Sequence, residues 1–555
     1  MAPLVLVLVL LLVLPVQGIA AVRCVVVRDE HNAQQDLKIE QWGENAVRVR
    51  AVPSGCSFRD DLVSALVPPT DGFAAAECGT VVLSTAGQTL TSGNLQATVG
   101  ADGLLTFTRL SDKKVLLSEA SVRGLTPTTT VPEREGFYAL NISFHATEGE
   151  RIYGLGQHKT GLLDNVGGKF QLSPMNTEIL IPVAHSSLGY AFLMNLPSFG
   201  SVELGKAAAP PAPCPSGSAK QCPSHPGKLF CPSIDDPHQC STTGLTTWQL
   251  STVIQADFWV ATTAPDSQVE TEEVSPWAQL QHAYANATGH APVYPEWASG
   301  FWQCKNRYHN QSQVIDVARG YIDRGYPISL IIIDYFNWNP NPLGDETLPA
   351  ACWPDPKGMV DELKQMGVEL MISPYFHSLT EQSKYYAKAL SEGFIVTNAT
   401  GQPAKVAFAN AYLYDLYNPA ARAYAWEAVE AGYIAPYGLH HWWLDCDEPC
   451  GGDMKSLAYN NGTWPASFVG AAYPHMVDQM VFEGMGAADK QYTHDNVMLG
   501  RSAWAGSQRW GGAVWSGDTH SDFANLNQQF RAGLNLVMSG IPYWCVYVLR
   551  KCSPS

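Results

Sequence analysis

Basic residues are scarce in this chain of 555 residues: 34 Lys and Arg stand against 51 Asp and Glu, which gives a net charge of −17. This charge argues against a nucleic-acid partner, because phosphates are bound by basic stripes and patches. Charged residues make up only 15% of the chain and apolar residues 46%, which is typical of a globular protein and excludes a disordered one. The 16 Trp and 23 Tyr suit both sugar stacking and large cores, so composition does not separate these two uses.

No second apolar run of about 18 residues follows the one at residues 2–20. That run ends in small residues, so residues 1–20 are predicted to be a cleaved signal peptide that leaves no membrane span. A secretory destination is expected, whether extracellular, vacuolar or lysosome-like, and five Asn-x-Ser/Thr sequons support it: Asn141, Asn286, Asn310, Asn398 and Asn461.

Four of the thirteen cysteines lie in a Pro-rich stretch at 206–242 that lacks the close Cys-x-x-Cys spacing of zinc sites. The stretch is therefore predicted to be a disulfide-stapled insertion, formed in an oxidising compartment: Cys214, Cys222, Cys231 and Cys240.

The chain shows two different patterns of predicted secondary structure, which indicate two domains. Residues 21–290 contain short β-rich segments between turn clusters and no convincing long helix, and this predicts an antiparallel β-sandwich that carries the insertion. In residues 291–555, apolar strands such as ISLIIID and HHWWLD alternate with helical stretches, which is typical of parallel α/β structure. No G-x-G-x-x-G or Walker motif follows a strand, so a (β/α)8 barrel is favoured over a nucleotide-binding sheet.

Three aspartates fall where predicted barrel strands end, which is where barrel enzymes place their chemistry. Asp334 directly follows the apolar stretch ISLIII, Asp445 follows HHWWL, and Asp518 follows AVWSG. Trp442, Trp443 and Trp515 place apolar walls beside these acids. Two carboxylates in one pocket permit glycoside hydrolysis, with one acting as acid and the other as nucleophile or base.

Other chemistries use similar residues. Asp445, Asp447 and Glu448 could ligate a hard metal, but adjacent residues of a strand face opposite ways. His440 and His441 offer zinc-type ligands, but H-E-x-x-H is absent and the pair is expected to diverge. No G-x-S-x-G motif supports a serine hydrolase. Cys446 and Cys450 are expected to form a loop disulfide or to pack.

The sequence resembles glycoside hydrolase family 31, the α-glucosidases and α-xylosidases, over nearly its whole length after residue 20. The words that carry the resemblance are YGLGQH, NLPSFGSVELG, GFWQCKNRY, RGYPISLIIIDYFNW, DLYNPAAR, WWLDCDEP, LGRSAWAGSQRWGG and WSGD. The resemblance implies a β-sandwich followed by the barrel, no cofactor or metal, and an oligosaccharide or glycoside substrate. Glucose and xylose both remain open, as do a transglycosylase or lyase outcome, the linkage and the oligomeric state.

Roles for individual residues follow from the resemblance. It implies that Asp445 is the nucleophile of a retaining exo-acting enzyme and that Asp518 is the general acid/base. Asp334 is implied to bind sugar hydroxyls in the subsite of the terminal sugar, and Arg501 to hold the nucleophile ionised. Trp443 and Trp515 are implied to line that subsite. Burial beside Trp515 is expected to help Asp518 keep its proton, whereas Asp447 and Glu448 are expected to be structural.

The resemblance stops after SGIPYW at 539–544, where the chain reads CVYVLRKCSPS. The barrel is therefore expected to be incomplete at its C-terminal end, with open strand edges. Two hypotheses follow: a retaining exo-α-glycosidase, or a truncated, inactive product that binds glycans at most.

Overall fold

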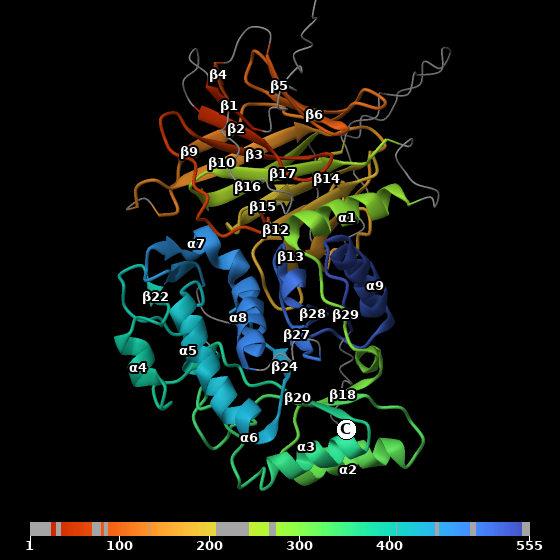
Figure 1. Ribbon diagram of the computed structural model, residues 1–555, viewed down its shortest axis with the longest axis vertical. Coiled ribbons are helices and arrows are strands. Elements are labelled where there is room, and N and C mark those ends of the chain that lie inside the picture. Colours follow the sequence, from red (N-terminus) through yellow and green to blue (C-terminus); the bar gives the residue numbers. More distant parts are fainter. Residues whose placement is uncertain are drawn as a thin grey trace, which may run out of the picture.

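The computed structural model describes residues 24–28, 35–68, 79–82, 87–131, 134–206, 244–265, 274–406, 408–449, 454–488 and 495–546. Sheets fill the upper part of Figure 1, and parallel strands with helices fill the lower part. Residues 1–20 and nearly all of 206–242 lie outside the described residues, so the predicted signal peptide and stapled insertion stay predictions.

The upper part contains three sheets. The eight-stranded sheet runs β11 (Ile152–Gln157), β13 (Ile179–Ser186), β14 (Tyr190–Met194), β17 (Ala256–Thr262), β3 (Ala46–Pro53), β2 (Gln35–Gln41), β1 (Cys24–Arg28), β4 (Gly79–Val82). The five-stranded sheet runs β12 (Lys169–Leu172), β15 (Gly200–Glu203), β16 (Leu245–Val253), β10 (Tyr138–His145), β9 (Gly124–Pro127). The four-stranded sheet runs β5 (Gln88–Ser92), β6 (Leu95–Val99), β7 (Leu105–Arg109), β8 (Lys114–Ser118).

Phenylalanine side chains join the three sheets into one core. Phe258 of β17 meets Phe107 of β7 at 6.3 Å and Phe144 of β10 at 6.4 Å between ring centroids, edge to face in both pairs. Alternation along the strands points these rings inward, as in β6, where every second residue is buried. The predicted sandwich is confirmed, and its strands pair antiparallel apart from β1 with β4.

One helix in this region contradicts the prediction that 21–290 contains no long helix. Helix α1 (Pro276–Thr288) is capped by Ser275, whose hydroxyl accepts from the amide of Ala278 at 3.2 Å, and it has a proline in its first turn. Its apolar stripe is thin, with only Leu280, Tyr284 and Ala287 as buried apolar positions. The 3.6-residue period is therefore weak in the sequence.

The lower part is built on one sheet whose seven described strands are all parallel to their neighbours. They run β18 (Trp302–Lys305), β19 (Leu330–Ile333), β20 (Glu369–Ile372), β24 (His441–Leu444), β27 (Met498–Gly500), β28 (Gly512–Trp515), β29 (Trp544–Cys545). Short strands occur in the loops: β21 (Ser378–Leu379) pairs with β23 (Tyr412–Leu413), and β25 (Leu457–Tyr459) pairs with β22 (Thr397–Asn398) and β26 (Trp464–Pro465). The predicted barrel-type parallel sheet is confirmed, and the incompleteness of the barrel stays a prediction.

Helices follow the strands, and side-chain caps fix where several of them begin. Asn310, Asp355, Asn418 and Asp522 each accept a hydrogen bond from a first-turn amide of α2, α3, α5 or α9. The helices are α2 (Gln311–Ile322), α3 (Pro356–Gln365), α4 (Tyr386–Ser391), α5 (Pro419–Val429), α6 (Ala435–Tyr437), α7 (Ala466–Val469), α8 (Tyr473–Ala488) and α9 (Phe523–Met538).

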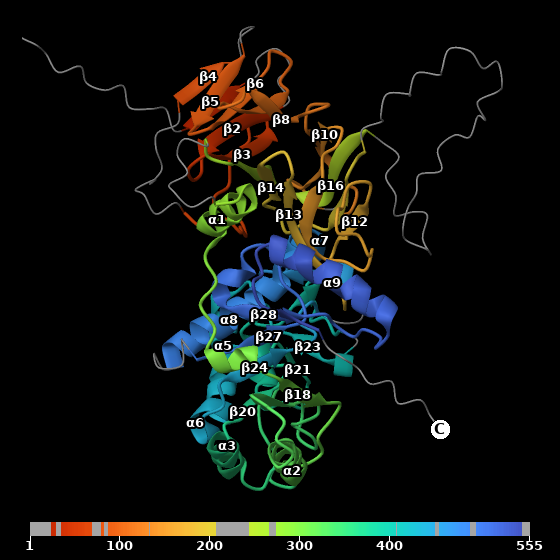
Figure 2. The ribbon, with the colours of Figure 1, turned by 90° about the vertical axis from the view of Figure 1, so that its right-hand side faces the viewer.

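The sandwich packs on the barrel sheet through α9, which lies directly below the sandwich strands in Figure 2. Helix α9 contacts β11. The amide of Gly154 donates to Asn535 Oδ1 at 2.9 Å, and that of Gly156 donates to Ser539 Oγ at 2.7 Å. Both glycines have a positive φ and lie so close to the carbonyls of β13 that a Cβ would clash. Within the described ranges, no helix has both the length and the apolar character needed to cross a bilayer.

Candidate active site

Four of the six residues singled out from the sequence lie at the carboxyl edge of the parallel sheet. Asp334, Asp445 and Arg501 each come directly after a strand (β19, β24 and β27), and Asp518 lies three residues beyond β28. Because parallel strands end at one edge, these side chains meet although 184 residues separate the first from the last.

Arg501 holds two carboxylates at once. Its Nη1 lies 2.8 Å from Asp445 Oδ1, while Nη2 and Nε lie 2.7 and 3.0 Å from the two oxygens of Glu448. Burial alone would lower the pKa of the guanidinium, but Glu448 and Asp445 outweigh it and raise that pKa. The charge on Arg501 is therefore permanent, and it lies directly beside Asp445. Glu448 was expected to be structural, and the arrangement shows how: its bidentate contact fixes the guanidinium that faces Asp445.

Tyr375, which comes after β20, is a second partner of Asp445. Its hydroxyl donates to Asp445 Oδ2, and its ring stacks on Phe408 with 4.6 Å between centroids and 9° between planes. Burial, and then the negative charge of Asp445, raise the pKa of Tyr375, so the hydroxyl keeps its proton and remains a donor. Tyr375 and Cys446 both have left-handed backbone, at φ of 58° and 59°, and such strain is common where side chains must be aimed at a site.

Asp334 lies deeper than the other two aspartates. Burial raises its pKa from 3.8 to about 7, with further rises from Asp445 and Asp518 and a decrease from Arg307. Its Oδ1 accepts a hydrogen bond of 2.7 Å from the amide of Tyr335. The carboxyls of Asp445 and Asp518 both interact with that of Asp334, so the three aspartates are electrostatically coupled through Asp334.

Replacing Asp334 with Asn should stabilise the protein above neutral pH. Between about pH 4 and pH 7 the folded protein keeps a proton on Asp334 that the unfolded chain has lost, so the free energy of unfolding falls as the pH rises through that window. Asn carries no charge, so we expect a gain of about 1–4 kcal/mol at pH 8 and little at pH 4.

Thermal unfolding of the parent and of Asp334→Asn at both pH values measures this gain. Asp316→Asn on the exposed face of α2 is the matched control, with no expected change at either pH. An equal change in midpoint at both pH values would show that Asp334 is not protonated in the folded protein.

Asp518 is exposed, so the expectation that burial beside Trp515 protects its proton is wrong. Its partner is instead a residue of the sandwich: Asn176 Nδ2 donates to Asp518 Oδ2 at 2.6 Å. The chain turns outward at Gly517, whose φ is 70°, and this carries Asp518 away from the buried strand.

Trp443 and Trp515 are buried inside the parallel sheet and pack edge to face with 5.2 Å between centroids. Side chains two apart share a face of a strand, so Trp443 lies one layer below Asp445. Both rings line a cavity of about 620 Å³, and the described residues of its lining include no carboxylate. The structure therefore places the two tryptophans beneath the carboxyls.

Asp447 is buried behind Asp445. Burial, and then Glu448 and Asp478, raise its pKa well above the usual range, and burial raises the pKa of Asp478 on α8 to about 8. Gly500 makes room for this acid, since a Cβ there would lie 2.9 Å from Asp447 Oδ2. Asp447 and Glu448 lie beyond β24, which ends at Leu444, and of these two acids Glu448 shares Arg501 with Asp445.

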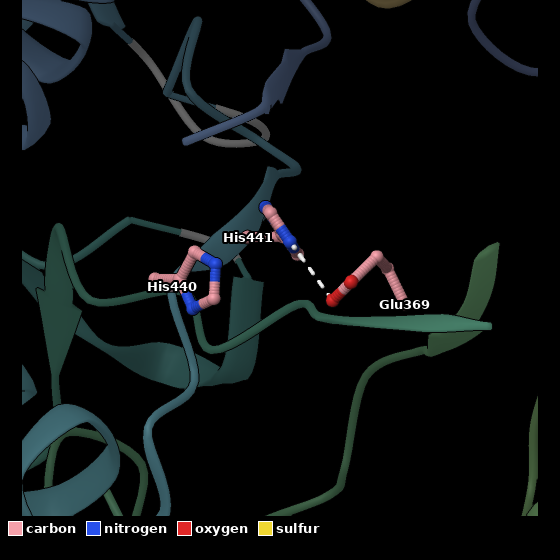
Figure 3. Close-up of side chains that lie close together, drawn as sticks. All are labelled: Glu369, His440 and His441. Carbon is pink, nitrogen blue, oxygen red and sulfur yellow. Dashed lines mark ion pairs between the residues drawn. The ribbon is translucent and has the colours of Figure 1, made fainter. Parts of the chain in front are cut away.

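Glu369, His440 and His441 gather at the opposite edge of the sheet (Figure 3), with their ligand atoms within 4.8 Å of one another. The two imidazoles were expected to diverge, but their ring centroids lie 4.1 Å apart because His440 precedes the strand. The amide of Val497 donates to His441 Nδ1 at 3.3 Å, so Nε2 carries the ring proton and faces Glu369 Oε2 at 3.4 Å. A metal would need that Nε2 lone pair, so the pattern favours a structural contact between strand ends.

Three residues of the site were missed in the sequence. Tyr375 and Arg307 follow β20 and β18 just as the aspartates follow their strands, so the strand-end rule could have found them. Asn176 offers no such signal, because it lies in a turn of the sandwich far from the barrel sequence.

Comparisons with known proteins agree with this arrangement. A family model described as the glycosyl hydrolases family 31 TIM-barrel domain matches residues 291–548. An uncharacterized family 31 glucosidase of Pseudescherichia vulneris is 32% identical over 534 residues, covering 92% of this chain and 89% of that protein. α-Xylosidase A of Aspergillus niger is 28% identical over 552 residues, covering 92% of this chain and 68% of that protein.

Solved structures are similar over the same span. The crystal structure of a family 31 α-xylosidase from a soil metagenome, complexed with xylose, superposes with a TM-score of 0.75 at 33% identity. The match covers 93% of this chain and 70% of that one, so it includes both the sandwich and the parallel sheet.

Proposed function

The chain belongs to glycoside hydrolase family 31, and on this premise we propose that it is a retaining exo-α-glycosidase that releases terminal α-linked xylose or glucose. The observation that carries the proposal is the different surroundings of two acids, Asp445 and Asp518, that both interact with Asp334. Asp445 lies between Arg501 and Tyr375, which suits a nucleophile, whereas Asp518 is exposed at the rim, where a leaving group departs.

The proposed reaction is a double displacement. Asp445 attacks the anomeric carbon while Asp518 gives its proton to the glycosidic oxygen, and the bond between that carbon and oxygen breaks. Asp518, now ionised, then takes a proton from water, which attacks the anomeric carbon and releases Asp445. Asp334 accepts hydrogen bonds from sugar hydroxyls. α-Xylosidases among the relatives support xylose as one of the two sugars.

Turnover of p-nitrophenyl α-xyloside and α-glucoside by the purified chain tests the proposal, with Asp445→Asn measured beside it. Activity that is lost in the variant supports a glycosidase that uses Asp445, and the ratio of the two rates selects the sugar. If the parent turned over neither substrate, the proposal would be contradicted. That result would favour the alternative of a truncated, inactive product.

Replacing Tyr375 with Phe should lower kcat by about 10–100-fold, the usual effect of losing one hydrogen bond to a charged group. Phe retains the stacking on Phe408, so the fold should persist. Steady-state kinetics measure the effect, and Tyr326→Phe at an exposed position is the control. A raised KM with unchanged kcat would show that Tyr375 serves binding and not the nucleophile.

We also propose that the chain passes through the secretory pathway, a proposal supported by the apolar run at residues 2–20. Among its sequons, Asn141, Asn286 and Asn461 are exposed and accessible to a glycosyl transfer enzyme. Treatment of the protein from its native source with an N-glycosidase should increase its electrophoretic mobility. Unchanged mobility together with an intact N-terminus would contradict this route.

A further inference from the structure

A turn of the sandwich reaches the acid at the barrel rim. It lies between β12 and β13, and Met175 and Glu178 close it by exchanging backbone hydrogen bonds of 3.2 and 2.9 Å. The side chain of Gln157 donates to the carbonyl of Thr177 at 3.1 Å, and the indole of Trp544 donates to Gln157 at 2.8 Å. The turn is thus anchored from the sandwich and from the parallel sheet, and it cannot be treated as a free surface loop.

Asn176 at the tip of this turn makes two contacts with Asp518. The backbone amide of Asp518 donates to Asn176 Oδ1 at 3.2 Å, and Asn176 Nδ2 donates to Asp518 Oδ2 at 2.6 Å. A backbone N–H can only donate, so this contact fixes the side-chain amide with its NH₂ toward the carboxylate.

The packing around this contact is close as well. A Cβ at Gly517 would lie 2.7 Å from the Thr177 amide and 2.8 Å from Asn176 Oδ1, so the turn rests directly on the backbone that carries Asp518. Gly517 therefore serves two needs, a positive φ and the approach of a segment from the other half of the molecule.

We propose that Asn176 is a positioning residue for Asp518, an inference that rests on the proposed function. Its amide occupies Oδ2, which leaves Oδ1 to carry the proton toward the glycosidic oxygen. The amide N–H also stabilises the carboxylate that forms as the proton leaves, so it favours the transition state over the protonated acid. The sandwich is then part of the catalytic machinery and not only a support for the barrel.

Leaving groups separate this role from a structural one. Asn176→Ala should lower kcat/KM by about 10–100-fold on a disaccharide, whose leaving oxygen needs the proton, as expected for one charge-assisted hydrogen bond. The loss should be several-fold smaller on a p-nitrophenyl glycoside, whose leaving group needs little protonation. Met175→Ala is the matched control, because its exposed side chain belongs to the same turn and should leave both rates unchanged.

The pH profile gives a second readout. Ala removes the hydrogen bond that Asn176 Nδ2 donates to Asp518 Oδ2, so the basic limb of kcat/KM should move to higher pH in Asn176→Ala. Asn176→Asp, which has the same size and adds a negative charge, should move it further. Asp334 interacts electrostatically with Asp518, and it is unchanged in these variants.

Asp518→Ala serves as the reference that separates the two proposals. If Asp518→Ala shows the leaving-group dependence but Asn176→Ala loses both substrates equally and keeps the parental pH profile, the inference about Asn176 is overturned alone. If Asp518→Ala itself shows no such dependence, the assigned acid is wrong and both proposals fall. The expected result is a dependence in both variants, smaller for Asn176→Ala.

Discussion

Asp445→Asn should lower kcat/KM on aryl α-glycosides by about 10⁴–10⁶-fold, the range seen when a covalent nucleophile is removed. The amide oxygen of Asn is neutral and a poor nucleophile, and it cannot form a stable glycosyl ester. The charge that Arg501 and Tyr375 surround would also be lost, so the site would no longer favour the positive charge that develops on the sugar.

Asp447→Asn is the matched control for this variant, because it changes an acid only two residues away. Burial raises the pKa of Asp447 and so favours its neutral carboxyl, and Asn is neutral as well. We expect at most a few-fold loss of activity. If Asp445→Asn retained more than about one hundredth of the parental rate, or if both variants lost activity equally, Asp445 would not be the nucleophile.

A rescue experiment extends this prediction. In Asp445→Ala, the space left by the carboxylate should admit azide, which can attack an activated α-glycosyl fluoride from the side that Asp445 would use. The product should be the β-glycosyl azide, formed as the carbon–fluorine bond breaks and fluoride leaves. Recovery of the α-azide, or of no azide product, would count against attack from the Asp445 side.

Asp518→Ala should lower kcat by about 10²–10⁴-fold on natural glycosides, the usual contribution of a general acid. The loss should shrink on activated aryl glycosides in the first step, because their leaving groups depart without a proton. Hydrolysis of the glycosyl-enzyme, which is the second step, should also become slow, because no base then activates water. A burst of p-nitrophenol in stopped-flow kinetics would therefore accompany the low steady rate.

Asp522→Asn is the control for Asp518→Ala. Asp522 caps α9 four residues further on, and Asn keeps the cap, so neither the fold nor the rate should change. An equal loss of kcat/KM on aryl and natural substrates in Asp518→Ala would contradict the assignment of Asp518 as the acid.

The sequence predicts this site well wherever the chemistry follows the barrel strands. Asp334, Asp445 and Arg501 each follow an apolar run directly, so a rule about parallel strand ends places them together before any coordinates are known. Tyr375 obeys the same rule and was missed because a tyrosine after a strand is common in cores. Its role depends on the Asp445 contact, which only the three-dimensional arrangement reveals.

Two features could not be predicted because they depend on distant contacts. Asp518 was expected to be buried beside Trp515, but it is exposed and follows Gly517, which has a positive φ. Its true partner, Asn176, is 342 residues away in a different sheet system. No periodicity or local motif encodes the docking of one half of the molecule on the other, which depends on the shapes of both.

The central claim is that Asp445 forms a covalent bond to the sugar, and trapping that bond tests it most directly. A 5-fluoro-α-glycosyl fluoride of the preferred sugar slows both steps and should leave the glycosyl-enzyme to accumulate. Peptide mass spectrometry after digestion should find one fluorosugar ester on the peptide that contains Asp445, and none in Asp445→Asn. A label on another residue, or turnover without any label, would contradict the account.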